Sequence, residues 1–463
     1  MRAGVAPGPR VTLVVEAPAS YEPERRYVLD VVLGDWLGLD WRLEPVARSD
    51  VRLTVDGADG CVVLPDVLFA TPRAEWLTPT SLPRRPLRRC EGVPVIYGAE
   101  AADELVRAVD DALVLAVDVL GSCFFMLTRL EERVVASRDA QGRFPADASL
   151  AHAEGFLGVP IVDVYVDLLW GALARRWPGL ERRRREYRVA LTHDVDDPLA
   201  LLGRGPRELA RQLGADVLVR RDPALAARRV GSWLAGARGG RRLDPYNTFD
   251  FLMDVSERHG LTSAFYFMAA DGAPGAEDPP YRLDDPWVER LIERIHRRGH
   301  EVGYHATDLD AERTVRGSEA VRAAAARAGV EQAAWGGRQH YLRWENPSTW
   351  RTWERGGLDY DATLAYADRI GFRTGTCHEF TVFDLEERRP LRLRERPFQV
   401  MDRTLFEYMG LAPEAAHAAV AGIAAQCRRH QGVLCVLWHN NVVVTARQKR
   451  AYAEMVEMAV AAR

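Results

Sequence analysis

From residue 244 onward the chain alternates between segments of helical and of strand-like hydrophobic periodicity, and this alternation constrains the fold more than any other feature. The apolar runs at 263–268, 301–305 and 433–438 are predicted to be buried strands, and each follows a segment with helical spacing. Strands that alternate with helices are typical of parallel βα units. The number of units predicts a barrel or near-barrel.

One earlier apolar run, at 189–191, ends abruptly in a histidine and three aspartates (His193, Asp194, Asp196 and Asp197). Ionisable groups at the end of a buried strand need a metal, a partner or water. Aspartates after a strand can also cap the next turn. His305 and His439, however, close two other predicted strands, and barrel enzymes place their catalytic residues at the carboxyl ends of strands. Together these residues predict a site.

The spacing within this segment indicates different roles for Asp194 and Asp196. Side chains alternate along a strand, so Asp194 and Asp196 are expected to project to the same side. One carboxylate can then bind a divalent cation while the other takes a proton from water. His305 offers a nitrogen ligand of the kind that zinc accepts, and His439 could protonate a leaving amine.

A chain of 463 residues with 47% hydrophobic residues can bury more than one core. The arginine run at 181–186 breaks the apolar periodicity, and we predict a boundary there. A smaller α/β domain would occupy residues 1–180, and the βα units would occupy 187–463. The basic run itself is predicted to be a solvated linker or helix end, with an anion-binding segment as the less favoured alternative.

Two other segments are predicted to be helical. Residues 103–119 have helical spacing within the first domain. Residues 199–243, rich in Arg, Ala, Leu and Gly, are predicted to form a helical insertion. Its arginines could contact an acidic substrate, but a solvated amphipathic face is the favoured interpretation.

The formal net charge of -4 gives no global attraction to nucleic acid or to an anionic membrane, so nucleic acid is not expected as a partner. The six cysteines form no Cys-x-x-Cys pair, which favours a reducing compartment. The amino-terminal run at 11–15 is too short for a signal peptide, and no apolar segment approaches the length of a membrane span. A cytoplasmic protein is the expectation.

Four ordered segments resemble the motifs of the polysaccharide deacetylases, carbohydrate esterase family 4, whose members share the NodB homology domain. The segments are Thr192-His193-Asp194-Val195-Asp196, Gly299-His300-Glu301-Val302-Gly303-Tyr304-His305, Arg338 and Leu437-Trp438-His439. The resemblance covers residues 187–463 and implies a distorted (β/α) barrel preceded by a smaller α/β domain. The segments 124–132, 338–343, 359–361 and 371–377 also resemble a bacterial subgroup with an amino-terminal accessory domain.

The resemblance implies roles for the catalytic residues. Asp194 would be the base, Arg338 would orient it, and His439 would be the general acid. The family's aspartate that tunes the acid histidine has no clear counterpart. Asp361 and Asp402 are both open as candidates.

The same resemblance implies one divalent metal, predicted to be Zn²⁺, with Co²⁺, Ni²⁺ or Mn²⁺ as alternatives. Asp196 and His305 would be ligands, but the position of the family's second metal histidine is Leu309, which cannot ligate a metal. We predict that His340, in the third motif, replaces it. The weaker alternatives are His193 and Asp308.

Tyr341, Arg373 and Trp438 are predicted to bind substrate, with a loop salt bridge as an equally favoured role for Arg373. The predicted function is a metal-dependent hydrolase that removes an N-acyl group, with acetyl favoured, from an amino sugar or related carbohydrate or small N-acyl compound. A hydrolase of another amide or a cyclic amide, and a catalytically degraded binding or assembly protein, remain alternatives.

Overall fold

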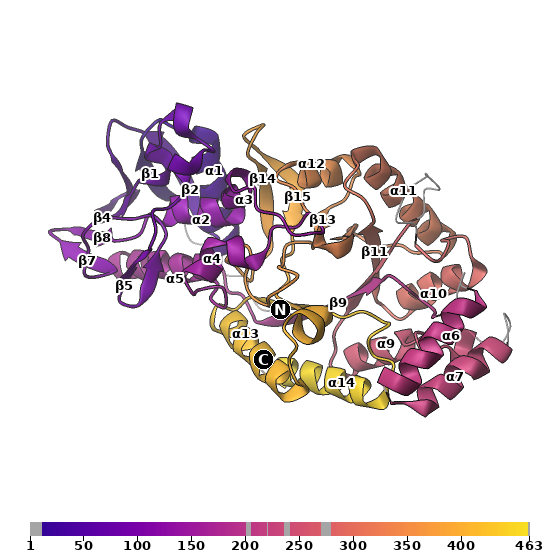
Figure 1. Ribbon diagram of the computed structural model, residues 1–463. Coiled ribbons are helices and arrows are strands. Elements are labelled where there is room, and N and C mark those ends of the chain that lie inside the picture. Colours follow the sequence, from indigo (N-terminus) through magenta and orange to yellow (C-terminus); the bar gives the residue numbers. More distant parts are fainter. Residues whose placement is uncertain (1–11, 201–204, 220, 236–240, 270–278, 462–463) are drawn as a thin grey trace, which may run out of the picture.

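The computed structural model describes residues 12–200, 205–219, 221–235, 241–269 and 279–461, and it contains two large sheets with helices around them (Figure 1). The first sheet has the order β2-β1-β3-β4-β8-β7. Its strands are β1 (Thr12–Ala17), β2 (Asp40–Pro45), β3 (Asp50–Val55), β4 (Ala58–Pro65), β7 (Val106–Val109) and β8 (Ala112–Leu115). A small hairpin pairs β5 (Arg88–Cys90) with β6 (Val93–Val95).

The helices of this amino-terminal part are α1 (Glu22–Leu29), the π-helix η1 (Asp30–Leu37), α2 (Val119–Leu127), α3 (Leu130–Val134), α4 (Leu150–Ala153) and α5 (Ile161–Arg176). The helix predicted over 103–119 is wrong, because the chain there forms the antiparallel pair β7 and β8. β-branched Val106, Val109 and Val114 favour strands, and the left-handed Asp110, at φ 51°, makes the turn between them.

The second sheet has nine strands in the order β14-β15-β13-β12-β11-β10-β9-β17-β16. They are β9 (Arg188–Val195), β10 (Ser263–Phe267), β11 (Glu301–Ala306), β12 (Gly336–Gln339), β13 (Tyr360–Asp361), β14 (Phe380–Asp384), β15 (Arg389–Glu395), β16 (Val400–Met401) and β17 (Val433–Leu437). All pairs are parallel except β14 with β15. Strand β17, which comes last in the sequence, pairs with β9, which comes first among these strands.

The second sheet differs from the expected barrel because it is open at one place. In the part of the chain that the structure describes, no strand ladder joins β14 or β15 to β16, so this mixed parallel and antiparallel sheet does not close into a barrel. The helices around it are α9 (Phe249–Arg258), α10 (Pro286–Arg297), α11 (Ala311–Arg327), α12 (Ser348–Arg355), α13 (Pro413–Arg429) and α14 (Ala446–Ala461), which form a broken ring (Figure 1). Among the described residues, no helix combines the length and apolarity that a membrane crossing requires.

The amino-terminal part packs on the edge of the second sheet. Phe383 of β14 contacts Tyr27 of α1 and Phe124 of α2 with ring centroids 4.9 and 5.3 Å apart. The Tyr27 hydroxyl also donates to the carbonyl of Thr381 over 2.8 Å. One apolar cluster therefore spans both sheets, and the edge strand is covered instead of being left open to pair with another chain.

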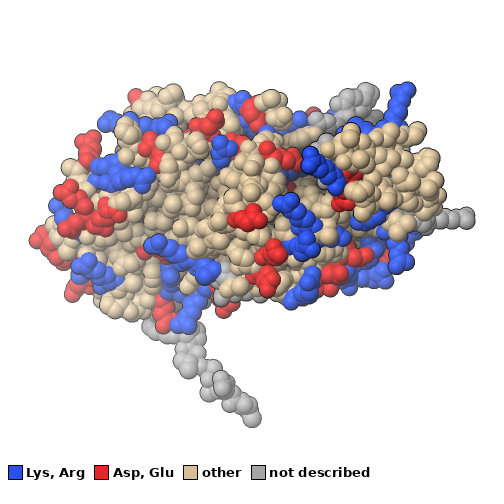
Figure 2. Space-filling view, turned by 60° about the horizontal axis from the view of Figure 1, so that its bottom comes forward, with Lys and Arg blue, Asp and Glu red and all other residues tan. Residues whose placement is uncertain are grey.

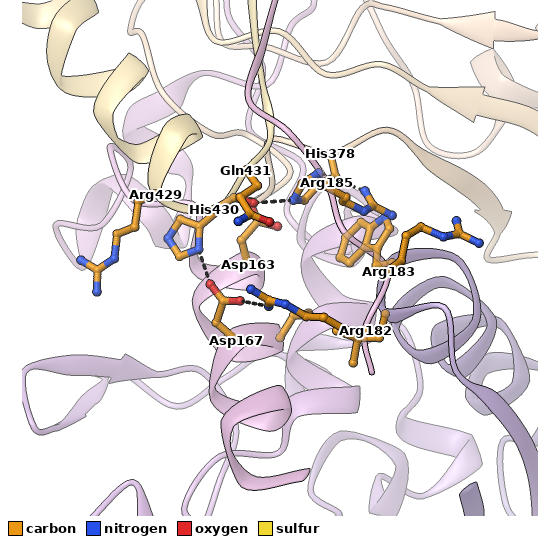
Figure 3. A pocket seen from close by; sticks show the side chains of 12 residues that line it. Asp163, Asp167, Arg182, Arg183, Arg185, His378, Arg429, His430 and Gln431 are labelled. Carbon is orange, nitrogen blue, oxygen red and sulfur yellow. Dashed lines mark hydrogen bonds and ion pairs between the residues drawn. The ribbon is translucent and has the colours of Figure 1, made fainter. Parts of the chain in front are cut away.

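The arginine run lines a small polar cavity between the amino-terminal part and the rest of the chain (Figure 3). Arg182 donates to Asp167 over 2.8 Å, and His430 from the loop after α13 contacts the same carboxylate over 2.8 Å. Arg185 contacts the Nδ1 of His378 at 3.1 Å. The run is thus an irregular linker, as predicted, but Arg182 and Arg185 are only partly exposed and bind groups from both parts of the chain.

A buried ion cluster also joins the two parts. Glu132 of α3 accepts two bonds from Arg373, at 2.9 and 2.6 Å, and one of 2.8 Å from Arg129. All three side chains are about 1% exposed. Although burial opposes it, the two guanidinium groups lower the pKa of Glu132 to about 2. The carboxylate is thus charged at neutral pH and is compensated from both sides.

We expect the Glu132→Gln substitution to destabilise the fold by roughly 3–5 kcal/mol, because it leaves the buried Arg373 guanidinium without its paired carboxylate and removes the shorter of the two ion pairs of Arg129. Urea-induced unfolding, followed by circular dichroism, measures this change. Arg133→Ala is the matched control, since Arg133 pairs with Glu386 at the surface and its loss should change stability by at most about 1 kcal/mol. Equal effects of the two substitutions would contradict the expectation.

Candidate active site

Four strands bring polar side chains to one cavity with a volume of about 420 Å³. That is the size of a small-molecule site. The carboxyl ends of β9, β11, β12 and β17 meet there because these strands and β10 form one continuous parallel stretch of the sheet. The predicted site residues that line it are Asp194, Asp196, His305, His340, Tyr341 and His439.

Arg338 of β12 lies beneath the cavity and fixes Asp194. Its Nη1 donates to Oδ1 of Asp194 over 2.7 Å, its Nη2 to the hydroxyl of Thr192 over 3.0 Å, and its Nε to the carbonyl of Ala362 over 2.7 Å. Burial would raise the pKa of Asp194, but Arg338 and His305 hold it below its ordinary value. Asp194 is therefore ionised, with Oδ2 as the oxygen that Arg338 does not hold.

His439 follows β17 and is held by Asp402. The carboxylate of Asp402 accepts the backbone N–H of His439 over 2.7 Å and contacts Nδ1 over 2.8 Å. Burial alone would lower the pKa of His439, but Asp402 and Asp196 raise it to about 9. Because Nδ1 is engaged, Nε2 is the nitrogen available to the cavity, 3.6 Å from Asp196.

Of the two open candidates for the acid-tuning aspartate, the structure places Asp402 against His439. Asp361 lies on β13, outside the cavity lining, and accepts a bond from Thr363. Burial raises the pKa of Asp361 to about 7. Asp361 is therefore a structural carboxyl group, and its selection as a candidate for tuning His439 is wrong.

Asp196, His305 and His340 form a cluster whose ligand atoms lie within 4.8 Å of one another. Nδ1 of His305 lies 2.9 Å from the carbonyl of Arg338, and it must carry the proton because a carbonyl only accepts. Nε2 of His305 then faces Oδ1 of Asp196 at 3.2 Å. A cation between these two buried atoms would satisfy both of them, so the residues present fit a divalent metal.

His340 has the protonation state that a ligand needs. Burial, followed by the nearby His305, lowers the pKa of His340 to about 4, so its imidazole is neutral at neutral pH. The chain turns sharply after it, with Tyr341 at φ 58°, and the two rings stack with centroids 3.8 Å apart. This turn places the His340 ring 5.1 Å from that of His305.

The weaker metal candidates lie outside this cluster. His193 is buried on the opposite side of β9, where Nδ1 contacts the carbonyl of Trp438 at 2.7 Å and the ring packs on Phe265. Asp308 pairs with Arg313 over 2.9 Å. Neither side chain joins the ligand atoms that Asp196, His305 and His340 bring together.

A second group, Asp163, Cys377 and His378, also has metal-ligand chemistry. Both nitrogens of His378 are engaged, because Nδ1 contacts Arg185 at 3.1 Å and Nε2 contacts the carbonyl of His430 at 3.2 Å. Asp163 accepts bonds from the hydroxyl of Thr376 and from the backbone and thiol of Cys377. These groups satisfy one another and form a structural network.

Two predicted substrate residues do not reach the cavity. Arg373 is bound to Glu132 and to the carbonyl of Ala365, in the interior between the two parts of the chain. Trp438 packs against Tyr452 with ring centroids 5.2 Å apart and is 3% exposed. A strand end directs alternate side chains to opposite faces, so the residue next to His439 points into the core.

Sequence reasoning missed several residues that line the cavity, namely Arg143, Arg403, Glu407 and Tyr408. Arg143 comes from the amino-terminal part, where its Nε donates to Asp139 over 2.7 Å. It donates further to the carbonyl of Tyr341 over 3.3 Å and to the hydroxyl of Tyr408 over 3.2 Å. Nothing local marked Arg143, because its role arises from a contact almost 200 residues away.

Residues 13–178 match the model of a family of unknown function (DUF7033). No curated protein matches the chain. Solved structures to which it is similar include a "putative polysaccharide deacetylase" from Mycobacterium smegmatis, with 18% identity and a TM-score of 0.37 over 60% of this chain and 85% of that one. Puue allantoinase has 11% identity and a TM-score of 0.38 over 61% and 85% of the two chains.

A third similar structure is the Xyl-CE4 domain of a multidomain xylanase from the hindgut metagenome of Trinervitermes trinervoides. Its identity is 12% and its TM-score 0.27, over 59% of this chain and 82% of that chain. All of these similarities are distant. The chemistry of this chain must therefore be argued from its own residues.

We expect the purified protein to bind one divalent metal per chain and His340→Ala to weaken that binding by at least about tenfold, because the cluster loses a ligand. Zinc titration of chelator-treated protein, with the metal measured by mass spectrometry, gives the stoichiometry without an activity assay. His378→Ala is the matched control from the second group. Full metal binding by His340→Ala, or its loss in His378→Ala, would contradict the assignment.

Proposed function

We propose that this protein is a metal-dependent hydrolase of the polysaccharide deacetylase type, which removes an N-acyl group, such as acetyl, from an amino sugar or related compound. One observation carries the proposal. A carboxylate fixed by Arg338 and a histidine fixed by Asp402 face one cavity with the metal-ligand cluster between them. That arrangement supplies a base and an acid to the two sides of a bound amide.

Asp196, His305 and His340 would hold the cation, for which we propose zinc. When bound, a divalent cation polarises the acyl carbonyl and lowers the pKa of water. Oδ2 of Asp194 takes the proton from the attacking water, because Oδ1 is held by Arg338. The ion pair keeps this carboxylate ionised and oriented towards the cavity.

The histidine completes the reaction. His439 donates the proton on Nε2 to the departing nitrogen, which leaves as an amine as the C–N bond breaks. Asp402 supports this step because it holds Nδ1 and stabilises the protonated ring. The exposed Tyr341 and the neighbouring Tyr408 offer flat surfaces for a sugar ring at the cavity mouth.

The Asp194→Asn substitution should lower kcat for acetate release from N-acetylated sugars by roughly 10²- to 10⁴-fold, because the base is lost. Asp308→Asn, which changes a carboxylate outside the ligand cluster, is the matched control and should retain activity. Thermal unfolding of both variants reports whether they fold. A fully active Asp194→Asn protein would refute the proposed mechanism, and activity that survives metal removal would favour a different amide hydrolase.

Arg143→Ala should raise KM by about tenfold with little change in kcat, because Tyr341 and Tyr408 lose two hydrogen bonds that position them. Steady-state kinetics on the same sugars separates the two constants. Arg138→Ala, an exposed residue of the same segment, should leave both unchanged. If kcat fell instead of KM rising, Arg143 would not be a residue that positions the binding wall.

A further inference from the structure

The helical insertion after β9 exposes several large apolar side chains. It contains α6 (Pro206–Gly214), the π-helix η6 (Ala215–Val219) and α7 (Pro223–Leu234). Its interior contains both apolar and polar side chains, and Arg229 is fully buried there and bonds to Asp216 and Gln212. On α6 the expected solvated amphipathic face is present, because Arg207 and Arg211 are exposed and Leu209 is buried. On η6 and α7, however, large apolar side chains are exposed as well.

The exposed apolar side chains are concentrated there. Ten large apolar residues are exposed in the described parts of the chain, and six of them lie between residues 217 and 243. They are Val217, Leu218, Val230, Trp233, Leu234 and Leu243, and we call them the apolar patch. Leu218 is 77% exposed, Leu234 71% and Trp233 51%. Clustered apolar exposure of this kind marks an interaction surface.

The charge around the apolar patch differs from that of the whole chain. Residues 201–243 contain ten arginines, no lysine and three acidic residues, whereas the chain carries a net charge of -4. Arg207, Arg211, Arg221, Arg228 and Arg242 are exposed. Figure 2 shows uncharged surface bordered by blue side chains at the right-hand end of the molecule, where α6 and α7 lie in Figure 1.

We propose that this insertion docks on an anionic lipid membrane, with the apolar patch in the acyl boundary and the exposed arginines on the headgroups. A surface element with Trp and Leu on one face and arginines beside them is the pattern of helices that lie in a bilayer interface. Trp233 suits this depth because its ring is apolar with one polar edge. The proposed contact is peripheral, since no helix in the described part of the chain is long and apolar enough to cross a bilayer.

Charge complementarity selects this partner over the others. A second copy of the chain would bring two sets of exposed arginines together, which repels. Nucleic acid would use the arginines but leave Leu218 and Leu234 in water. An anionic bilayer satisfies the apolar patch and the arginines at once.

The test is co-sedimentation of the full-length protein with phosphatidylcholine vesicles, with and without about one third phosphatidylglycerol. We expect binding that needs the anionic lipid. Trp233→Ser with Leu234→Ser should weaken it roughly 100-fold, because two side chains leave the acyl boundary. Arg221→Gln with Arg228→Gln should weaken it roughly 30-fold, since each arginine contributes about a fivefold factor.

The matched control is Val67→Ser with Val109→Ser, two valines of similar exposure outside the insertion, which should leave vesicle binding unchanged. The substituted side chains are exposed, so unchanged thermal unfolding is expected and reports an intact fold. Absence of vesicle binding, or binding that neither pair of insertion substitutions weakens, would overturn the proposal. So would a dimer that Trp233→Ser with Leu234→Ser dissociates in the absence of lipid.

Discussion

The buried contact of Arg338 with Asp194 connects strands that do not pair with each other. β12 and β9 are separated in the sheet by β11 and β10, and the guanidinium spans the interior between them. Its plane lies over the rings of Tyr266 and Phe398, 5.1 and 4.5 Å from their centroids. The contact therefore adds a direct link across the interior between two strands that the ladder joins only through β11 and β10. The same contact orients Asp194 in the cavity.

In the candidate metal cluster, His340 stands where the resemblance implied a ligand at position 309. Leu309 follows β11, where it cannot bind a metal, and His340 follows the neighbouring strand β12. Neighbouring parallel strands end side by side, so a side chain after either one reaches the same rim. The left-handed turn at Tyr341 then directs the His340 ring towards His305. The cluster therefore depends on the backbone turn at Tyr341 as well as on the histidine at position 340.

The sequence predicted the strands that carry the cavity because long apolar runs followed by polar residues are strong local signals. It predicted Asp194, Asp196, His305 and His439 at one rim for the same reason. It failed where the deciding contact is distant. The segment 106–115 forms a hairpin instead of the predicted helix, because strand pairing outweighs its helical spacing. Arg373 points away from the cavity because it binds Glu132. Periodicity alone likewise did not reveal that Trp233 and Leu234 of α7 are exposed while Arg229 is buried.

The amino-terminal part is integral to the cavity rather than attached beside it. Its apolar core continues into β14 and β15, and Glu132 compensates Arg373 of the other part. Arg129, beside Glu132, also contacts the hydroxyl of Tyr366, whose ring packs with Phe144 next to Arg143. Each step of this chain is a buried contact, so displacement of the ion cluster would shift the wall that Arg143 holds. The candidate catalytic groups come from one part of the chain, but the cavity is lined by both, because Arg143 belongs to the amino-terminal part.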